Sequence, residues 1–233
     1  MRKPDEQHPE RLAFEKGRQE TRATLRFWRE DHFKVLIPWA LGSLGIALLM
    51  FLGAWLVSLL PHPSTEDFVP MFTRDDNTRA DFTWILTRNM LVLSMHLLIC
   101  VAAYLSRRTI PMQAKHTEGI NRWVHEHAGP LAMAIVAGLT TYSLCLQAWN
   151  LGIDLNSAAH TMNRSTGALL LQSAFHGIPE LTAIFLPLSA CLMLGRRKLW
   201  NQLMAAAILC AVITIPILCA TAAMEVWVTP HIT

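Results

Sequence analysis

The sequence predicts an all-α membrane protein, a bundle of five transmembrane helices with an N-terminal amphipathic interfacial helix. Three observations predict this fold. Hydrophobic residues make up 52% of the 233 residues and charged residues only 16%. Five apolar runs are each long enough to cross a bilayer, and Lys and Arg gather in alternate connecting segments. This composition is too apolar for an ordinary soluble domain and too charged for membrane spans alone.

The first unit, residues 1–34, is predicted to be a cytoplasmic or interfacial amphipathic helix. Apolar side chains alternate with Arg and Glu at Leu12, Leu25, Phe27, Trp28 and Phe33. Such a helix is typical of the membrane surface, and the alternative is a docking surface for a soluble partner. The segment lacks the short apolar core and small-residue cleavage site of a signal peptide, so we expect the first apolar run to act as an uncleaved anchor.

Residues 35–233 are predicted to form a single transmembrane domain. Each of its apolar runs meets the requirement of about 20 residues for crossing a hydrocarbon core of about 30 Å. The last two runs are long, which indicates tilt, a kink or protruding ends, and Pro187 and Pro216 are candidate bends. The predicted spans are about 35–60, 84–105, 130–153, 167–195 and 199–228.

The basic residues predict that the N-terminus lies inside and the C-terminus outside. The inside segments would be 1–34, 107–128 and 196–198. Of the 20 Lys and Arg residues, all lie in these segments except Arg74, Arg79, Arg88 and Arg164. Cytoplasmic loops of membrane proteins carry such an excess of basic residues. The acidic loop 61–82 would then be a solvated outside loop.

The residues that cost the most free energy to place inside a membrane are His176 and Glu180. They lie in the fourth run, in the stretch Phe175-His176-Gly177-Ile178-Pro179-Glu180. Ionisable groups inside a membrane are expensive and usually face a protein interior or a cavity. The spacing of four residues puts His176 and Glu180 on one helix face. Gly177 and Pro179 between them predict a break or kink at this point.

The predicted topology gathers the strongly polar groups of the spans in the outer half of the membrane. A polar pocket that opens outward is therefore expected. Its carboxyl groups would be neutralised by a proton, by Arg88 or a histidine, or by a metal ion. The residues concerned are Arg88, Asn89, His96, Gln172, His176, Glu180 and Glu225.

Three hypotheses remain open for His176, Glu180 and Glu225. They could be a structural network that locks the helices together, or a site for a ligand or proton. They could also be a catalytic acid–base centre or a metal centre, because one His and two carboxylates can hold zinc or another divalent metal with an open position. The usual zinc-protease spacing of two His is absent, so a metal centre would need His96 as a further ligand.

The sequence also carries motifs that resemble a known family. His176-Gly177-x-x-Glu180 opens an apolar stretch, Asn89 lies in the second run, and the last run ends Glu225-Val226-Trp227-Val228-Thr229-Pro230. These residues resemble the stage II sporulation protein M family of bacterial integral membrane proteins. The resemblance implies a protein of five or six membrane helices in the bacterial cytoplasmic membrane, without an agreed chemical activity. The founding member acts with peptidoglycan-degrading proteins, and relatives occur beside ABC transporter or bacteriocin-maturation components.

From these observations we expect an integral membrane scaffold or transport-associated subunit that recruits or positions such partners. Membrane lipids and protein partners are expected, and a homo-oligomer is an alternative assembly. An intramembrane metal-dependent or acid–base enzyme acting on a peptide or lipid-linked substrate is the first alternative. A proton- or ion-coupled carrier is the second. The net charge of +3 is explained by the inside segments, so nucleic-acid binding has no support.

Overall fold

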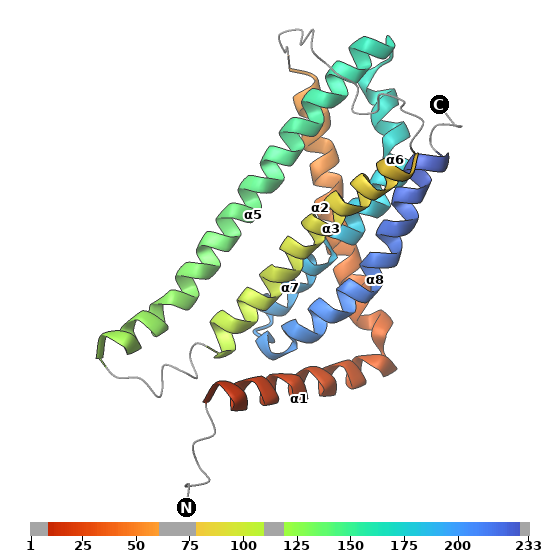
Figure 1. The fold of residues 1–233 in the computed structure, drawn as a ribbon. Coiled ribbons are helices and arrows are strands. Elements are labelled where there is room, and N and C mark those ends of the chain that lie inside the picture. The colour runs from red at the N-terminus through yellow and green to blue at the C-terminus, as the bar shows by residue number, and fades with distance from the viewer. Residues whose placement is uncertain (1–8, 61–77, 110–118, 229–233) are drawn as a thin grey trace, which may run out of the picture.

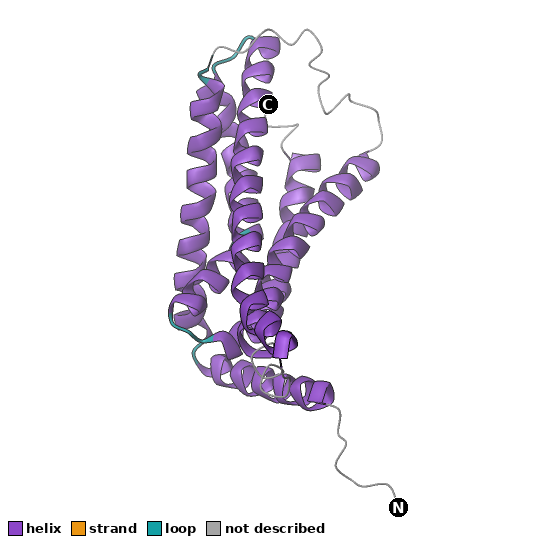
Figure 2. Ribbon diagram, turned by 90° about the vertical axis from the view of Figure 1, so that its left-hand side faces the viewer, coloured by secondary structure: helices purple, strands orange, loops and turns teal. Residues whose placement is uncertain are grey.

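The computed structural model describes residues 9–60, 78–109 and 119–228, and regular structure in these ranges is helical, with no strand (Figures 1 and 2). The protein is therefore all-α, as predicted. Most of the predicted acidic loop 61–82, and Thr229-Pro230 of the family-like ending, lie outside the described residues. The helices are α1 (Pro9–Glu30), α2 (His32–Ser58), α3 (Thr78–Tyr104), η1 (Leu105–Thr109), α5 (Gly119–Met162), α6 (Thr166–Ile184), α7 (Leu186–Arg196), η2 (Trp200–Gln202), α8 (Leu203–Ala223) and η3 (Met224–Val228).

Three helical segments of the described chain are long and apolar enough to cross a membrane: His32–Ser58, Thr78–Arg107 and Trp200–Val228. A fourth is added if α6 and α7, which are bent by 43° at their junction, form one span. The third apolar run of the sequence lies in α5, a helix of 44 residues. These helices are those of a membrane protein.

The fourth segment breaks at the candidate bend near Pro187 and not at the second predicted place, residues 177–179. Helix α6 continues through Gly177 and Pro179 to Ile184, and the break falls at Phe185, just before Pro187. The prediction of a break within residues 177–179 is therefore wrong. The physical reason for the observed position is that Pro187 has no N–H, so the carbonyl of Ala183, four residues earlier, loses its helical partner. Helix α8 runs unbroken through Pro216.

Side chains from three neighbouring helices satisfy the backbone at this break. The Thr214 hydroxyl of α8 donates to the Ala183 carbonyl at 3.0 Å. The Ser43 hydroxyl of α2 donates to the Thr182 carbonyl, and the Cys100 thiol of α3 donates to the Pro187 carbonyl at 3.3 Å. Irregular backbone at membrane depth is tolerated only where protein groups or water take up its free polar atoms. Here the protein does so, and the bonds join α2, α3 and α8 to the broken helix.

The ring of Phe185 fills the space at the break and is 0% exposed. It meets the His96 ring edge-to-face, with centroids 5.4 Å apart and planes at 77°. Ala47, Leu93 and Leu218 belong to the same buried cluster. The break is therefore packed with side chains, and the described residues leave it closed.

Helix α1 lies across one end of the bundle (Figure 1). Its buried face carries Thr21, Thr24 and Trp28. The two hydroxyls bond back to their own helix, Thr21 to the Gly17 carbonyl at 2.7 Å and Thr24 to the Glu20 carbonyl at 2.9 Å. This face can therefore be buried without unpaired hydroxyls.

The aromatic residues near the α1–α2 joint differ in their roles. Trp28 packs edge-to-face on Trp39 of α2, with ring centroids 5.3 Å apart. Phe27 is 73% exposed and Phe33 is 67% exposed. Trp28 thus attaches α1 to the bundle, whereas the two Phe side chains remain on the outer surface, where apolar rings favour the lipid interface.

The hydrogen bond from Thr214 to the Ala183 carbonyl at the break predicts a specific loss of stability. Thr214→Val keeps the side-chain volume but leaves the Ala183 carbonyl without its donor, so we expect a loss of about 1 kcal/mol. The measurement is thermal unfolding of the purified protein in mild detergent. Thr221→Val is the matched control, since that hydroxyl bonds only to Leu218 of its own helix at 3.2 Å. Equal melting temperatures for the two variants would contradict a stabilising role for the Thr214 hydrogen bond.

Candidate intramembrane polar site

Four of the predicted polar residues come together from three segments. Helix α3 supplies Arg88 and Asn89, α6 supplies Glu180 and the last turn η3 supplies Glu225. The Glu180 carboxyl lies within electrostatic range of Glu225 and Arg88 and beside the Asn89 amide. Glu225 is itself within range of Arg88. The arrangement is a small charged cluster between helices that are distant in the sequence.

The charges of this cluster do not touch. Among the described residues, the only ion pair with nitrogen and oxygen within 4.0 Å is Lys34–Asp31, at 2.8 Å. Arg88 is held instead over the exposed indole of Trp84, with its Cζ atom 5.7 Å from the ring centroid. A guanidinium over an aromatic face is attracted by the ring quadrupole. Arg88 therefore offsets the carboxyl groups across a gap.

A further carboxyl group, not singled out from the sequence, belongs to this site. Asp154 of α5 also lies within electrostatic range of Arg88. The sequence gives little indication that Asp154 belongs to the site, because Asp154 directly follows the third apolar run, one helical turn after Asn150. One guanidinium thus serves Asp154, Glu180 and Glu225. If all three were ionised, negative charge would be in excess, and a proton or a cation would offset it.

Two buried polar atoms near the charged residues are unpaired. The Asn89 side chain is 6% exposed, and its Nδ2 atom has no hydrogen-bond partner within 3.5 Å among the described residues. The Nδ1 atom of His176 likewise has no hydrogen-bond partner among the described residues. Buried polar groups in proteins are nearly always hydrogen-bonded. The Asn89 amide acts on the Glu180 carboxyl from beyond this distance, whereas the His176 ring nitrogen has unused capacity to bind water, an ion or a polar ligand.

His96 and Gln172 are engaged elsewhere. The Nδ1 atom of His96 lies 2.9 Å from the Val92 carbonyl, so this nitrogen carries the proton and donates, and its ring packs on Phe185 at the break. The Oε1 atom of Gln172 accepts from Arg164 at 3.4 Å. His96 is therefore tied to the core of the bundle, and Gln172 to the turn between α5 and α6.

Within the described ranges, no group of three or more His, Cys, Asp or Glu side chains is placed so that it could hold a metal ion. This includes the predicted ligands His96, His176, Glu180 and Glu225. The charged groups that the structure does bring together are carboxyls around an arginine, and such groups can exchange a proton or bind a cation without a dedicated ligand cage.

The fold and the site together define a helical membrane protein with a cluster of charged side chains, not in direct contact, between its helices. No protein-family model, curated protein or solved structure matches the chain.

The shared arginine predicts thermodynamic coupling within the cluster. Arg88→Gln should lower thermal stability, because the carboxyl groups lose their cation. The cost should be smaller in a Glu180→Gln background, with a coupling free energy of about 1 kcal/mol. A double-mutant cycle of melting temperatures in detergent measures this coupling. Arg79→Gln, an exposed change on the same helix, is the control and should be additive with Glu180→Gln. Additivity of Arg88→Gln as well would contradict the cluster.

Proposed function

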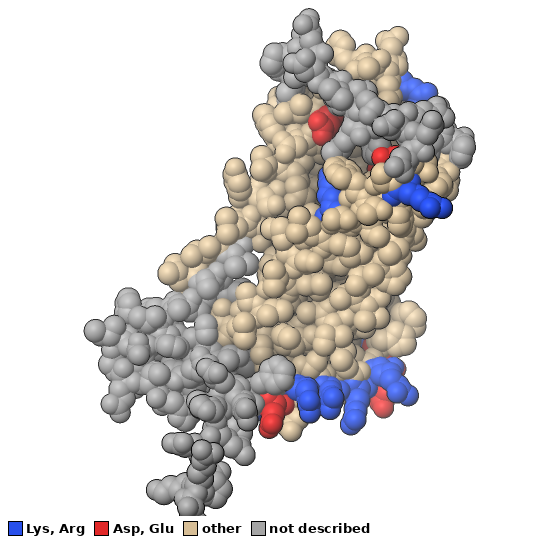
Figure 3. All heavy atoms as spheres, in the orientation of Figure 1, with Lys and Arg blue, Asp and Glu red and all other residues tan. Residues whose placement is uncertain are grey.

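We propose that this chain is a multi-pass protein of the bacterial cytoplasmic membrane, with five spans, an inside N-terminus and an outside C-terminus. The spans would be α2, α3, the apolar part of α5, the α6–α7 pair, and η2 with α8 and η3. On the face drawn in Figure 3, Lys and Arg line the α1 end, and a broad band without charged groups lies above them. Basic residues at the cytoplasmic end support this orientation.

The orientation can be tested by cysteine labelling. In a Cys145→Ser background, which removes the exposed native thiol, Arg164→Cys would mark the outer turn and Arg196→Cys the inner one. A membrane-impermeant maleimide should label only Arg164→Cys in intact cells and both variants after permeabilisation. The background protein without either new cysteine is the control. Labelling of Arg196→Cys in intact cells would overturn the proposed topology.

We further propose that the chain is a membrane scaffold or transport-associated subunit that recruits or positions partners. The observation that carries this proposal is the closed break at Phe185. In carriers, a discontinuous helix lines the substrate cavity with its free backbone groups. Here Thr214 and Ser43 take up the free carbonyls and Phe185 fills the space. This supports a bundle held in one arrangement rather than one that alternates.

Helix α1 offers the surface on which partners would assemble. Its buried face attaches to the bundle, while Arg18, Arg22, Arg26 and Arg29 are exposed on its other faces. On the resemblance to the stage II sporulation protein M family, the partners would be peptidoglycan-remodelling proteins, ABC transporter components or peptide-maturation components. A second copy of the chain is the remaining alternative.

Photocrosslinking in cells tests the scaffold. A photoreactive amino acid at Arg22 should give one discrete protein adduct, because this side chain is exposed on α1. The same group at Leu49, which is exposed on the apolar surface of α2, should react with lipid only and serves as the control. A chain that is monomeric, gives no adduct at Arg22 and is active alone after purification would refute the scaffold proposal.

A proton- or ion-coupled carrier remains a second candidate function because of one specific observation. Three carboxyl groups share Arg88, and Asn89 and His176 hold unpaired polar atoms among the described residues. Such a site has room for a proton or a cation. Flux through the purified chain in liposomes that disappears in Glu180→Gln would favour the carrier over the scaffold. The intramembrane enzyme stays an alternative hypothesis without a comparable observation.

A further inference from the structure

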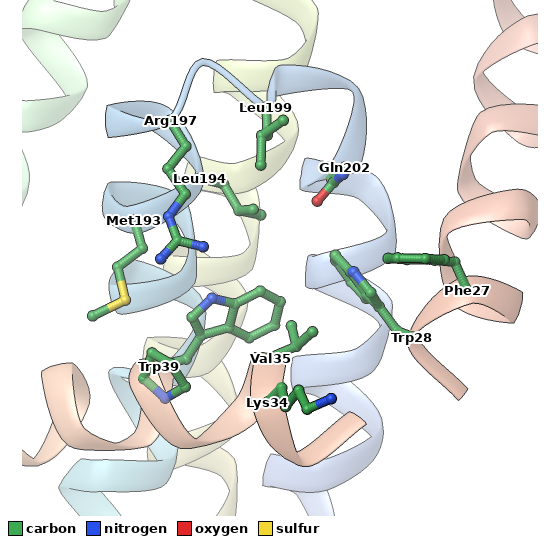
Figure 4. Close-up of a pocket in the computed structure, with 11 residues that line it drawn as sticks. Phe27, Trp28, Lys34, Val35, Trp39, Met193, Leu194, Arg197, Leu199 and Gln202 are labelled. Atoms are coloured by element: carbon green, nitrogen blue, oxygen red, sulfur yellow. The ribbon is translucent and has the colours of Figure 1, made fainter. Parts of the chain in front are cut away.

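A pocket of about 220 Å³ lies at the opposite end of the bundle from the charged cluster, where α1, α2, α7 and η2 meet (Figure 4). The residues that matter for its chemistry are Trp28, Lys34, Trp39, Met193, Arg197 and Gln202. Figure 4 shows Arg197 turned from its loop toward Trp39, with Met193 beside it and Lys34 at the far edge. The pocket therefore joins an aromatic and apolar wall to two cationic groups.

The fold builds this pocket from two tight joints. The first is the single residue Asp31 between α1 and α2, across which Trp28 reaches Trp39. Both indoles are nearly buried, at 4% and 3% exposure, so this wall is held in place by core packing. The second joint is the turn after α7, where Lys198 adopts a left-handed backbone with φ of 58°. This turn brings Arg197 back over the pocket.

The two cations differ in how far they are already neutralised. The Lys34 ammonium pairs with Asp31 at 2.8 Å. Among the described residues, no carboxylate pairs with Arg197. Gln202 adds an amide that can donate a hydrogen bond. The pocket thus presents one uncompensated guanidinium beside apolar surface, and this combination suits a ligand that has an anionic group and an apolar body. Arg is the side chain whose planar fork best matches phosphate oxygens.

We propose that this pocket binds the headgroup phosphate of an anionic phospholipid of the inner leaflet. Arg197 is its main phosphate ligand and Lys34 a second one, and the acyl chains lie along the apolar surface beside Met193. A pocket of 220 Å³ is smaller than the cavities that enclose drug-sized molecules, about 300–1,000 Å³. It therefore holds a headgroup rather than a whole lipid.

The surroundings of the pocket favour a lipid over a soluble anion. The exposed rings of Phe27 and Phe33 flank the α1–α2 joint, as expected of a surface in contact with acyl chains. Basic residues of α1 line the same end of the molecule (Figure 3), and such residues are attracted to anionic leaflets. The inference rests on the proposed membrane orientation, and it gives α1 a reason to lie across the bundle, because a bound headgroup would bridge α2 and the turn after α7.

The test is lipid retention by the full chain. Delipidated protein is incubated in mild detergent with phosphatidylglycerol or with phosphatidylcholine of the same acyl chains, and native mass spectrometry counts the bound lipids. We expect one retained phosphatidylglycerol and no comparable phosphatidylcholine. Arg197→Gln should weaken this binding about tenfold, the change expected when a charge-assisted hydrogen bond is lost. Lys34→Gln should weaken it less, because Asp31 already neutralises Lys34.

The matched control is Arg196→Gln, which removes the same charge from the neighbouring exposed residue outside the pocket. Equal losses in the Arg196 and Arg197 variants would mean general charge attraction and would overturn the site. So would equal retention of phosphatidylcholine. Displacement of the lipid by millimolar glycerol phosphate would indicate a soluble phosphate ligand. It would overturn the proposal that the ligand of the pocket is a lipid. Unchanged melting temperatures show that the variants are folded. The assay needs no partner protein and no orientation, so its failure leaves the scaffold proposal standing, and failure of the scaffold proposal leaves the assay valid.

Discussion

The hydrogen bond from Thr214 to the Ala183 carbonyl is the constraint on which the rest of the bundle depends. Pro187 deprives that carbonyl of its helical donor, and inside a membrane no bulk water replaces it. Loss of such an interhelical hydrogen bond costs about 1 kcal/mol, and the donors come from α8 and, for the adjacent carbonyl, from Ser43 of α2. The carbonyls at the α6–α7 break are therefore hydrogen-bonded only when α2 and α8 pack beside them.

The break between α6 and α7 also determines which residues lie at each end of the molecule. Before the bend of 43°, α6 brings Glu180 to the side of α3 and η3. After it, α7 leads to the turn that places Arg197 over the pocket beside α1. Buried clusters of the described residues lie on both sides, one around Phe185 and one around Trp39 and Leu203. The charged cluster and the basic pocket thus depend on one piece of backbone geometry, although they share no residue.

Much of this architecture could be predicted from composition and apolar run length, because these reflect the solvent that each helix must face. A bend in this run could be predicted both at Pro187 and at Gly177 and Pro179, but the sequence did not show which of the two would interrupt the helix. Pro179 and Pro187 both remove a backbone donor, and the difference between them lies outside their own helix, in the hydroxyls that neighbours supply at Ala183 and Thr182. The place of Asp154 in the site could not be predicted for a similar reason, since it depends on Arg88 of another helix. Local sequence does not reveal such partners.

The contrast between the break and the charged cluster bears on what the cluster is for. A polar network that serves only to lock helices should use its donors fully, since half-satisfied buried networks cost more than apolar packing. At the break, Thr214 and Ser43 donate to backbone carbonyls, although the buried Thr182 and Ser189 hydroxyls beside it have no hydrogen-bond partner among the described residues. In the charged cluster, Arg88 stands apart from the carboxyls, and Asn89 and His176 have unpaired atoms within the described chain. The spare hydrogen-bonding capacity beside Glu180 is what a proton, an ion or a polar ligand would use.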